Sequence, residues 1–337
     1  MFHIIRSANE RGRSLPRRTF LHLALGAAAL PAVARLARAQ AYPSRTIKII
    51  APVAAGTVAD LVPRLIAESL AARWGQPIVV ENRPGGATNI GTEAAARAEP
   101  DGYTLLVSPA TALVVNQSLY PKLPFDPAAF VPVTVLADQP NVLVARATLP
   151  VSSAKELIAY AKRNPGKLSF ASSGVGTVQH LGMEQLKAMT GIDIVHVPYR
   201  GLGPALSDLV AGHVDLMLDN LGTSAPQIKN GALKGIAVGS ERRNPLLPDI
   251  PAISETVPGF VSTTWFAMVA PPKTPGAIAD QLFAAIAEVL KLPEVRGRLR
   301  DLYAEPIGQA PAETAAFFTR ERARWRDVIE AAGVKPQ

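Results

Sequence analysis

The sequence of 337 residues contains no cysteine. That absence excludes disulfides, thiolate metal sites and a cysteine nucleophile together. Aromatic residues make up only 6% of the chain and charged residues only 18%, whereas 48% of the residues are hydrophobic. A fold without disulfides has to be stabilised by its packed core, and this composition supplies the apolar side chains that such a core needs.

Motifs of nucleotide binding and of hydrolytic enzymes are also missing. The run Gly174–Gln179 begins like a dinucleotide fingerprint, but its last residue stands where Gly or Ala is required, and no lysine follows at P-loop spacing. No G-x-S-x-G elbow occurs, and Ser152–Lys155 fits S-x-x-K without the accompanying motifs of penicillin-binding enzymes. The histidines after the first 41 residues, His180, His196 and His213, are not spaced as metal ligands. We therefore expect no cofactor and no metal, and leave open a serine–histidine site that only the fold would assemble.

The first 41 residues have the features of a cleaved export signal. Arg17 and Arg18 precede an apolar run, Phe20–Val33, that is too short to cross a bilayer, and small residues alternate through Ala37–Ala41. The long polar lead before the arginine pair favours the twin-arginine route, and an ordinary secretory signal with a chance Arg-Arg pair is the alternative. Either route takes the mature chain to the periplasm, away from ATP and nicotinamide cofactors.

The net charge of +8 comes mostly from this N-terminal segment. It holds seven of the 35 basic residues and one of the 27 acidic residues, which leaves 28 and 26 in the mature chain. A net charge of +2 gives no basis for a nucleic-acid partner. No later stretch approaches the length of a membrane span, so we expect a soluble product of about two ordinary domains.

Apolar strands alternate with helical patterns from Thr46 onward, and the rhythm restarts after Asn141–Ala145. The βαβαβ order predicts an α/β fold in which each unit is a mostly parallel sheet flanked by helices. Two such units, joined twice by extended segments, predict two lobes with a ligand cleft between them. We place lobe 1 at residues 42–143 plus 264–337 and lobe 2 at residues 144–263, after the export signal at residues 1–41.

The first helix is expected over Asp60–Trp74, with Asp60 as its N-cap and Pro63 in the first turn, where proline is tolerated. The other expected helices are Asn89–Ala98, Ser153–Arg163, Thr177–Thr190, Pro204–Ala211, Ala225–Asn230, Pro275–Leu290, Pro293–Leu302 and Pro311–Ala332. The expected strands are Thr46–Ala51, Ile78–Glu81, Tyr103–Ser108, Asn141–Ala145, Leu168–Ala171, Asp193–Val197, Val214–Asp219, Leu233–Val238 and the extended segment Ser262–Ala270.

Two strand-to-helix turns, one in each lobe, combine small residues with a helix start. They are Pro52–Asp60 and Ser172–Thr177, the second followed by His180. Small residues let the backbone approach a ligand, and the free N–H groups of a helix start hold anions such as carboxylates. For either turn alone, a plain tight turn is the simpler interpretation, with Thr177 as an ordinary N-cap. The pair facing one cleft favours an anion site.

Three further polar residues follow or lie within predicted strands. Asp219 ends a strand, and it would accept a hydrogen bond from a ligand ammonium or hydroxyl group or simply form a turn. Arg200 pairs either with a ligand carboxylate or, as we favour, with a surface acid. His196 lies in an apolar strand and is expected to be a hydrogen-bonded core residue.

Several motifs closely resemble those of the tripartite tricarboxylate transporter receptors, the Bug family of periplasmic substrate-binding proteins. The resemblance spans residues 43–335. Its motifs are Gln76–Gly86 continuing through Asn89-Ile90-Gly91, Pro100–Leu106, Gly174–Thr177 with His180-Leu181, His196–Gly201, Gly212–Asp215 and Leu247–Pro251.

This resemblance implies a two-lobed type II periplasmic binding protein fold that holds a small carboxylate or dicarboxylate between its lobes. It further implies a receptor without enzymatic activity, which works as a monomer with the membrane permease subunits of such a transporter. The ligand-binding residues that it implies are Ala54, Ala55, Gly56, Thr57 and Asp60 on one side, Ser173, Gly176, Thr177 and His180 on the other, and Ser108, Thr111 and Asp219 nearby.

The first turn departs from the family pattern. The family usually has Pro-Phe-x-Pro-Gly-Gly, whereas this chain has Pro52–Thr57, so that Thr57 replaces the second glycine. Thr57 would either donate its hydroxyl to the ligand or reshape the pocket. Two alternatives to a transport receptor also stay open. One is a receptor that passes its ligand to a sensor kinase, and the other is an exported esterase that uses Ser173 or Ser108.

Overall fold

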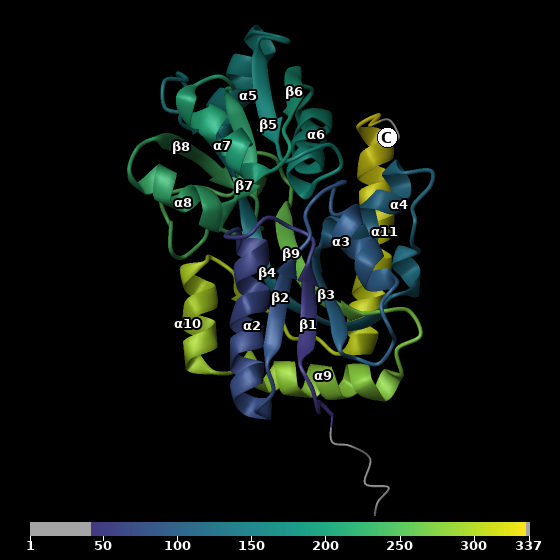
Figure 1. The fold of residues 1–337 in the computed structure, drawn as a ribbon. Helices are drawn as coiled ribbons and strands as arrows, with labels where there is room; N and C mark the ends of the chain where they lie inside the picture. The colour runs from purple at the N-terminus through teal and green to yellow at the C-terminus, as the bar shows by residue number, and fades with distance from the viewer. Residues whose placement is uncertain (1–41, 335–337) are drawn as a thin grey trace, which may run out of the picture. The chain divides into compact units, whose positions relative to one another are not determined.

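A computed structural model describes residues 42–334 of the chain (Figure 1). The expected export signal, residues 1–41, lies outside the described residues, so its cleavage and its route stay predictions. Arg45–Gln337 forms one compact unit. No helix in the described part of this unit has the length and hydropathy that a membrane crossing requires.

The strands of residues 45–334 join into one ten-stranded sheet in the order β2-β1-β3-β9-β4-β7-β5-β6, with β8 and β10 also paired to β4. Two parallel sets lie in it, β1 with β2 and β3, and β5 with β6 and β7, whereas β4 and β9 run antiparallel to their neighbours. The strands are β1 (Ile47–Ala51), β2 (Ile78–Asn82), β3 (Thr104–Pro109), β4 (Val131–Arg146), β5 (Leu168–Ser172), β6 (Ile194–Pro198), β7 (Leu216–Asn220), β8 (Leu233–Val238), β9 (Thr263–Ala270) and β10 (Glu305–Pro306).

Helices follow the strands almost as the apolar spacing predicts, and the α/β prediction is confirmed. In Figure 1, α2 lies beside α10, while α3, α4 and α11 gather on the other side of β1 and β3. The helices are α2 (Val58–Trp74), α3 (Asn89–Ala96), the π-helix η1 (Thr111–Val115), α4 (Asn116–Leu119), α5 (Ala154–Arg163), α6 (Val178–Thr190), α7 (Leu202–Ala211), α8 (Leu221–Lys229), α9 (Gly276–Val289), α10 (Pro293–Asp301) and α11 (Pro311–Ala331), with short 3-10 turns η2 (Pro127–Ala129) and η3 (Ile253–Glu255).

The sheet has two parts, one around the parallel strands β1 to β3 and one around the parallel strands β5 to β7, and the long strand β4 runs through both. Its first part pairs with β9, and Asn141 to Arg146 pair with β7 and β8. The sequence prediction found only Asn141–Ala145, because Asp138, Gln139 and Pro140 interrupt the apolar pattern before it. Both Gln139 and Asn141 are nevertheless buried, since the strand continues between its neighbours there.

Two segments of the chain cross between the parts of the sheet, and they are tied to each other. The Asn141 N–H donates to the Ser262 carbonyl oxygen at 3.1 Å, and the Gly239 N–H donates to the Asn141 carbonyl oxygen. Asn141 Nδ2 also donates to Ser262 Oγ at 2.8 Å. The predicted lobe boundaries, 143/144 and 263/264, lie near this crossing and stay a prediction.

Each part of the sheet has its own core. One apolar cluster joins β1, β3 and β9 to η1 and to Phe318 and Trp325 of α11, and it also takes in Val178 and Leu181 from the start of α6. Two more clusters cover the opposite faces of the sheet around β5 and β7. The start of α6 thus packs against the core of the β1–β3 part, which fixes the position of the turn that precedes it.

The predicted start of the first helix was wrong. Helix α2 begins at Val58 with Thr57 as its N-cap, so Asp60 is the third helical residue and Pro63 lies inside the helix. The Asp60 carboxylate bonds the Gly56 N–H and the Arg64 side chain, so it caps no N–H of the first turn. Helix α8 likewise begins at Leu221, four residues before the predicted start, with Pro226 inside it.

Candidate functional site

The candidate site is built from loops at the carboxyl ends of the two parallel strand sets. In open α/β sheets, ligands bind outside these strand ends. The first loop, Pro52–Thr57, joins β1 to α2, and the second loop, Ser172–Thr177, joins β5 to α6. Ser108 lies at the end of β3, Thr111 begins η1 directly after it, and Asp219 lies at the end of β7.

The first loop is exposed at its small residues and fixed at its base. Ala54, Ala55 and Gly56 are exposed, and no atom lies within 4 Å of the position that a Cβ would take on Gly56. The Thr57 hydroxyl donates to the Ala54 carbonyl oxygen at 2.9 Å. Its hydrogen bond therefore stays within the loop.

Asp60 lies beneath the first loop and is buried. Its Oδ2 accepts the Gly56 N–H at 2.9 Å, while Oδ1 accepts Arg64 Nε at 2.9 Å and Asn82 Nδ2 at 2.8 Å. Burial raises the pKa of Asp60, but these hydrogen bonds outweigh it and lower the pKa below its usual value. Asn82 Nδ2 also donates to the Val53 carbonyl oxygen, so the carboxylate organises the loop from below.

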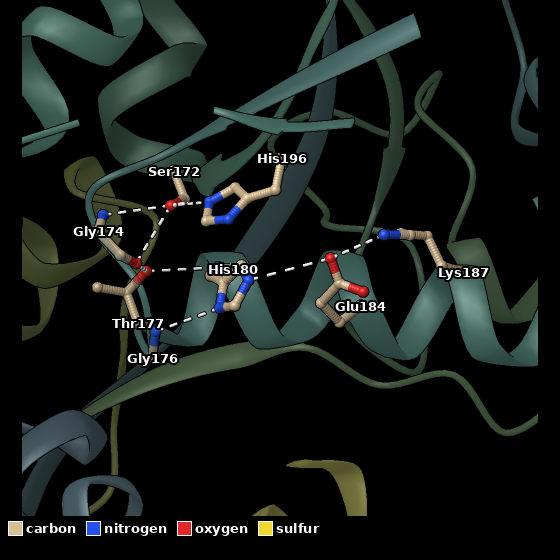
Figure 2. A network of polar contacts seen from close by, with 8 residues as sticks. All are labelled: Ser172, Gly174, Gly176, Thr177, His180, Glu184, Lys187 and His196. Carbon is tan, nitrogen blue, oxygen red and sulfur yellow. Dashed lines mark hydrogen bonds and ion pairs between the residues drawn. The ribbon is translucent and has the colours of Figure 1, made fainter. Parts of the chain in front are cut away.

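The second loop repeats this arrangement with a histidine (Figure 2). His180 Nδ1 accepts the Gly176 N–H at 3.2 Å, and the Thr177 hydroxyl donates to the Gly174 carbonyl oxygen at 2.8 Å. Thr177 is the N-cap of α6, and its Oγ also accepts the His180 N–H at 3.4 Å. Ser173 is half-buried, whereas Gly176, Thr177 and His180 are buried.

Two histidines stack beside the second loop. The ring of His196 lies 4.0 Å from that of His180 and 4.7 Å from that of Phe170, measured between centroids. Burial, together with His196 and Lys187, lowers the pKa of His180 to about 3. Burial and Lys187 lower the pKa of His196 to about 4. Both rings are therefore neutral at physiological pH, and His180 can accept the Gly176 N–H.

His196 also forms a serine–histidine pair, with Ser172 Oγ and His196 Nε2 at 2.6 Å. Ser172 is fully buried and its Oγ also accepts the Gly174 N–H, so it is enclosed by its own loop. Among the described residues no carboxylate bonds the second nitrogen of His196. Ser108, one of the two serines considered for an esterase, bonds the Pro109 carbonyl oxygen. The pair thus lacks the exposed nucleophile and the acidic partner of a catalytic triad.

Thr111, at the start of η1, and Asp219, at the end of β7, are both buried. Asp219 Oδ2 accepts the Ser224 hydroxyl at 2.7 Å, but Asp219 Oδ1 has no hydrogen-bond partner among the described residues. Burial raises the pKa of Asp219 to about 6, against the opposing hydrogen bonds of Ser224 and the Asn220 N–H. The β5–β7 register pairs Ala171 with Met217, so Asp219 stands farther toward the edge where the second loop begins.

Asn116, at the start of α4, belongs to this region and was missed from the sequence. Its side chain is fully buried, and its Nδ2 donates to the Ala87 carbonyl oxygen and to Asn89 Oδ1. Its Oδ1 has no partner among the described residues and lies 4.0 Å from the position of a Cβ on Gly176. A polar residue directly after the apolar run Leu113–Val115 was the available signal.

Comparison with known proteins decides the family. The sequence model described as tripartite tricarboxylate transporter family receptor matches residues 62–334. The chain belongs to this receptor family. The expected resemblance, including the Bug proteins, is therefore confirmed.

Relatives of this receptor cover most of the chain. Protein BugT of Bordetella pertussis is 37% identical over 88% of this chain and 92% of its own length. The structure of R. palustris Rpa4515 with adipate matches with a TM-score of 0.84 and 36% identity, over 88% of this chain and all of that one. MatC of Rhodopseudomonas palustris with bound malate matches with a TM-score of 0.78 and 35% identity, over 86% and 100%. This likeness confirms the two-lobed fold of periplasmic binding proteins.

Within residues 42–334, the receptor has no group of three or more histidines and acids placed to hold a metal ion. Its polar groups at the loops are instead backbone N–H groups, hydroxyls and amides. Several N–H groups where the loops enter their helices have no acceptor among the described residues. They are those of Thr57, Val58 and Ala59 at the start of α2 and those of Val178 and Gln179 at the start of α6. Such groups at a helix start attract anions.

Proposed function

We propose that this receptor captures a small carboxylate in the periplasm and delivers it to the membrane subunits of a tripartite tricarboxylate transporter. The single observation that carries the proposal is the pair of loops with unpaired N–H groups at the starts of α2 and α6. Relatives with bound adipate and malate support the ligand class. The binding step involves no covalent chemistry, because N–H groups and hydroxyls hold the anion directly.

The ligand-binding residues proposed for this site are those of the two loops and the strand ends. The direct contacts would come from Ala54, Ala55, Gly56, Thr57 and Ser173, with Gly176, Thr177, Ser108, Thr111 and the buried Asp219 shaping the pocket. Asp60 and His180 are not among the direct contacts, because both side chains already hold the loops.

Two buried acceptor atoms narrow the ligand class further. Asn116 Oδ1 and Asp219 Oδ1 both lack a donor among the described residues. A buried acceptor without a donor costs stability, and a ligand hydroxyl or ammonium group would supply one. We therefore propose a ligand that carries such a donor in addition to its carboxylate.

A thermal-shift and calorimetry series tests both statements. Malate, adipate and the corresponding diamides are added to the mature protein, and a ligand at 100-fold excess over Kd is expected to stabilise it by about 2.7 kcal/mol. Malate, which has a hydroxyl group, should bind more tightly than adipate, and the uncharged diamides should not bind. If no carboxylate shifts the melting temperature, the carboxylate proposal is wrong; equal affinities for malate and adipate would remove only the donor requirement.

A transport assay then separates delivery from sensing. Vesicles that carry the membrane subunits are expected to accumulate labelled malate only when the receptor is added. Binding without uptake would leave a sensing receptor as the better explanation. The buried Ser172–His196 pair predicts no turnover of simple esters, and ester hydrolysis that Ser172→Ala abolishes would instead favour the esterase.

A further inference from the structure

Each of the two loops contains a hydrogen bond of the same kind, which a helix start does not require. In each loop a glycine N–H donates to the side chain four residues later, Gly56 to Asp60 and Gly176 to His180. We call each of these a glycine bond. In the ordinary capping box, the side chain at this helical position reaches the N-cap residue itself. Here it reaches one residue farther back, to the glycine before the N-cap.

The backbone of the two loops agrees closely around the glycine bonds. Gly56 has φ of 81° and Gly176 has φ of 80°, both in the left-handed region. The N-cap threonines follow with φ and ψ of −77° and 160° for Thr57 and −71° and 156° for Thr177. Each threonine hydroxyl bonds the carbonyl oxygen three residues earlier. From the glycine to the N-cap threonine, the two loops therefore have the same local structure.

The acceptors of the glycine bonds have little capacity left for a ligand. Asp60 is 2% exposed and both of its oxygens already accept from Gly56, Arg64 and Asn82. His180 is 4% exposed and its Nδ1 accepts the Gly176 N–H, so the ring proton is on Nε2. That nitrogen faces Glu184 Oε1 at 3.9 Å.

We propose that Asp60 and His180 are positioning residues of the carboxylate site. Each holds its glycine in the left-handed conformation and thereby directs the unpaired N–H groups of the following residues toward the ligand. This assigns both residues a role different from the direct ligand contact expected from the sequence. The proposal rests on the proposed function, because the N–H groups that are positioned are those of the carboxylate site.

The groups around His180 make the second glycine bond the better one to test. His196 from β6 and Phe170 from β5 stack with the ring. Glu184 and Lys187 lie one and two turns farther along α6 (Figure 2). Among the neighbours named here, only His180 offers the Gly176 N–H an acceptor. His180→Asn keeps an acceptor oxygen at the same bond separation from the backbone as Nδ1, whereas His180→Ala removes it.

The experiment measures two properties of the same variants. Amide exchange of Gly176, followed by NMR in the ligand-free protein, reports the glycine bond itself. Calorimetric titration with malate and with adipate reports the carboxylate site. His180→Ala is expected to speed Gly176 exchange and to weaken binding about tenfold, which corresponds to about 1.4 kcal/mol. His180→Asn is expected to stay close to wild type in both, and the exposed His213→Ala is the control.

Each outcome decides the proposal. Unchanged Gly176 exchange in His180→Ala would overturn the glycine bond, and equal loss of affinity in the Asn and Ala variants would make the imidazole a direct ligand contact. If wild type binds neither acid, the proposed function fails on its own, and the exchange measurement still decides the bond. Should His180→Ala not fold, His180→Gln, whose acceptor lies one bond farther out, is expected to show the same faster exchange.

Discussion

The first and second loops have matching backbone dihedral angles at the glycine and the N-cap threonine but different acceptors beneath them. The first reads Gly-Thr-Val-Ala-Asp at Gly56–Asp60, and the second reads Gly-Thr-Val-Gln-His at Gly176–His180. A carboxylate surrounded by donors holds the first glycine, whereas a neutral imidazole stacked on the His196 ring holds the second. The comparison shows that either a charged or a neutral side chain, buried four residues after the glycine, can accept its N–H.

The surroundings of the two glycines differ as well. A Cβ on Gly56 would meet open space, but a Cβ on Gly176 would collide with Leu119 Cδ1 from α4. Leu119 is fully buried, and the start of α6 packs into the same apolar cluster. At its glycine, the first loop is thus held by Asp60, whereas the second is held by His180 and is also packed against Leu119 of α4.

The largest expected effect is a difference in unfolding free energy between the alanine variants of the two glycines, which arises from this packing difference. Gly176→Ala and Gly56→Ala both force an L side chain into the left-handed region, which costs about 1–2 kcal/mol. Gly176→Ala also overpacks a buried site, which adds about 1–3 kcal/mol. Chemical denaturation should therefore show a clearly larger loss of unfolding free energy for Gly176→Ala. Adding Leu119→Ala to each variant is the control, and it should reduce the cost of the extra methyl group only for Gly176→Ala. Equal losses for the two single variants would contradict the packing difference.

The next effect concerns the charges of two buried carboxyls, Asp60 and Asp219. The folded pKa of Asp219, about 6, lies above its unfolded value, so its stabilising contribution is complete at low pH and is lost as the pH rises through 6. Asp219→Asn should therefore gain stability relative to wild type between pH 4 and pH 7, by about 2 kcal/mol. The pKa of Asp60 is lowered, so its contribution is present above the unfolded pKa and lost in acid.

Asp60→Asn should accordingly lose stability at neutral pH, the opposite sign from Asp219→Asn. Unfolding free energies of both variants and of wild type, measured in urea from about pH 3 to pH 8, check the pair of predictions. The comparison uses differences from wild type because burial also raises the pKa of Asp138 to about 6. Parallel pH profiles for the two variants would show that Asp60 and Asp219 do not differ as described.

The smallest expected effect distinguishes the two threonines. Thr177→Val removes a hydroxyl that bonds Gly174 and also accepts the His180 N–H, whereas Thr57→Val removes only the bond to Ala54. Thr177→Val should cost about 1 kcal/mol and Thr57→Val about half of that. Melting temperatures and malate affinity measured side by side check this order, and a larger loss for Thr57→Val would reverse the assignment.

Much of the fold was predictable because its elements follow local patterns. Most strands and helices begin and end within a few residues of the predicted positions, since apolar spacing and capping residues such as Ser153 act locally. The predicted helix start at Asp60 was wrong, although aspartate is a residue type that often caps helix N-termini. Its actual partners are Gly56 from the loop, Arg64 from α2 itself and Asn82 from β2, and Asn82 lies 22 residues away.

In the candidate site, too, features defined by neighbouring residues were predictable and features defined by distant residues were not. The two glycine-rich turns were visible as small residues before helix starts, and the resemblance to the receptor family was carried by continuous motifs. Asn116 and the Ser172–His196 pair were not foreseen, because the contacts that define them join residues 24 or more positions apart. No periodicity or short motif reports such distances.

By itself, the sequence determined the α/β rhythm, the absence of disulfides, the start of α6 at Thr177 and the family. Those properties depend on neighbours along the chain, where propensity, capping and apolar spacing act directly. Only the tertiary structure decided that Asp60 and His180 lie beneath their glycines and that Gly176 faces Leu119. The glycine bonds join residues only four positions apart, but the burial of both acceptors and the contact with Leu119 depend on elements that come together only when the sheet has formed.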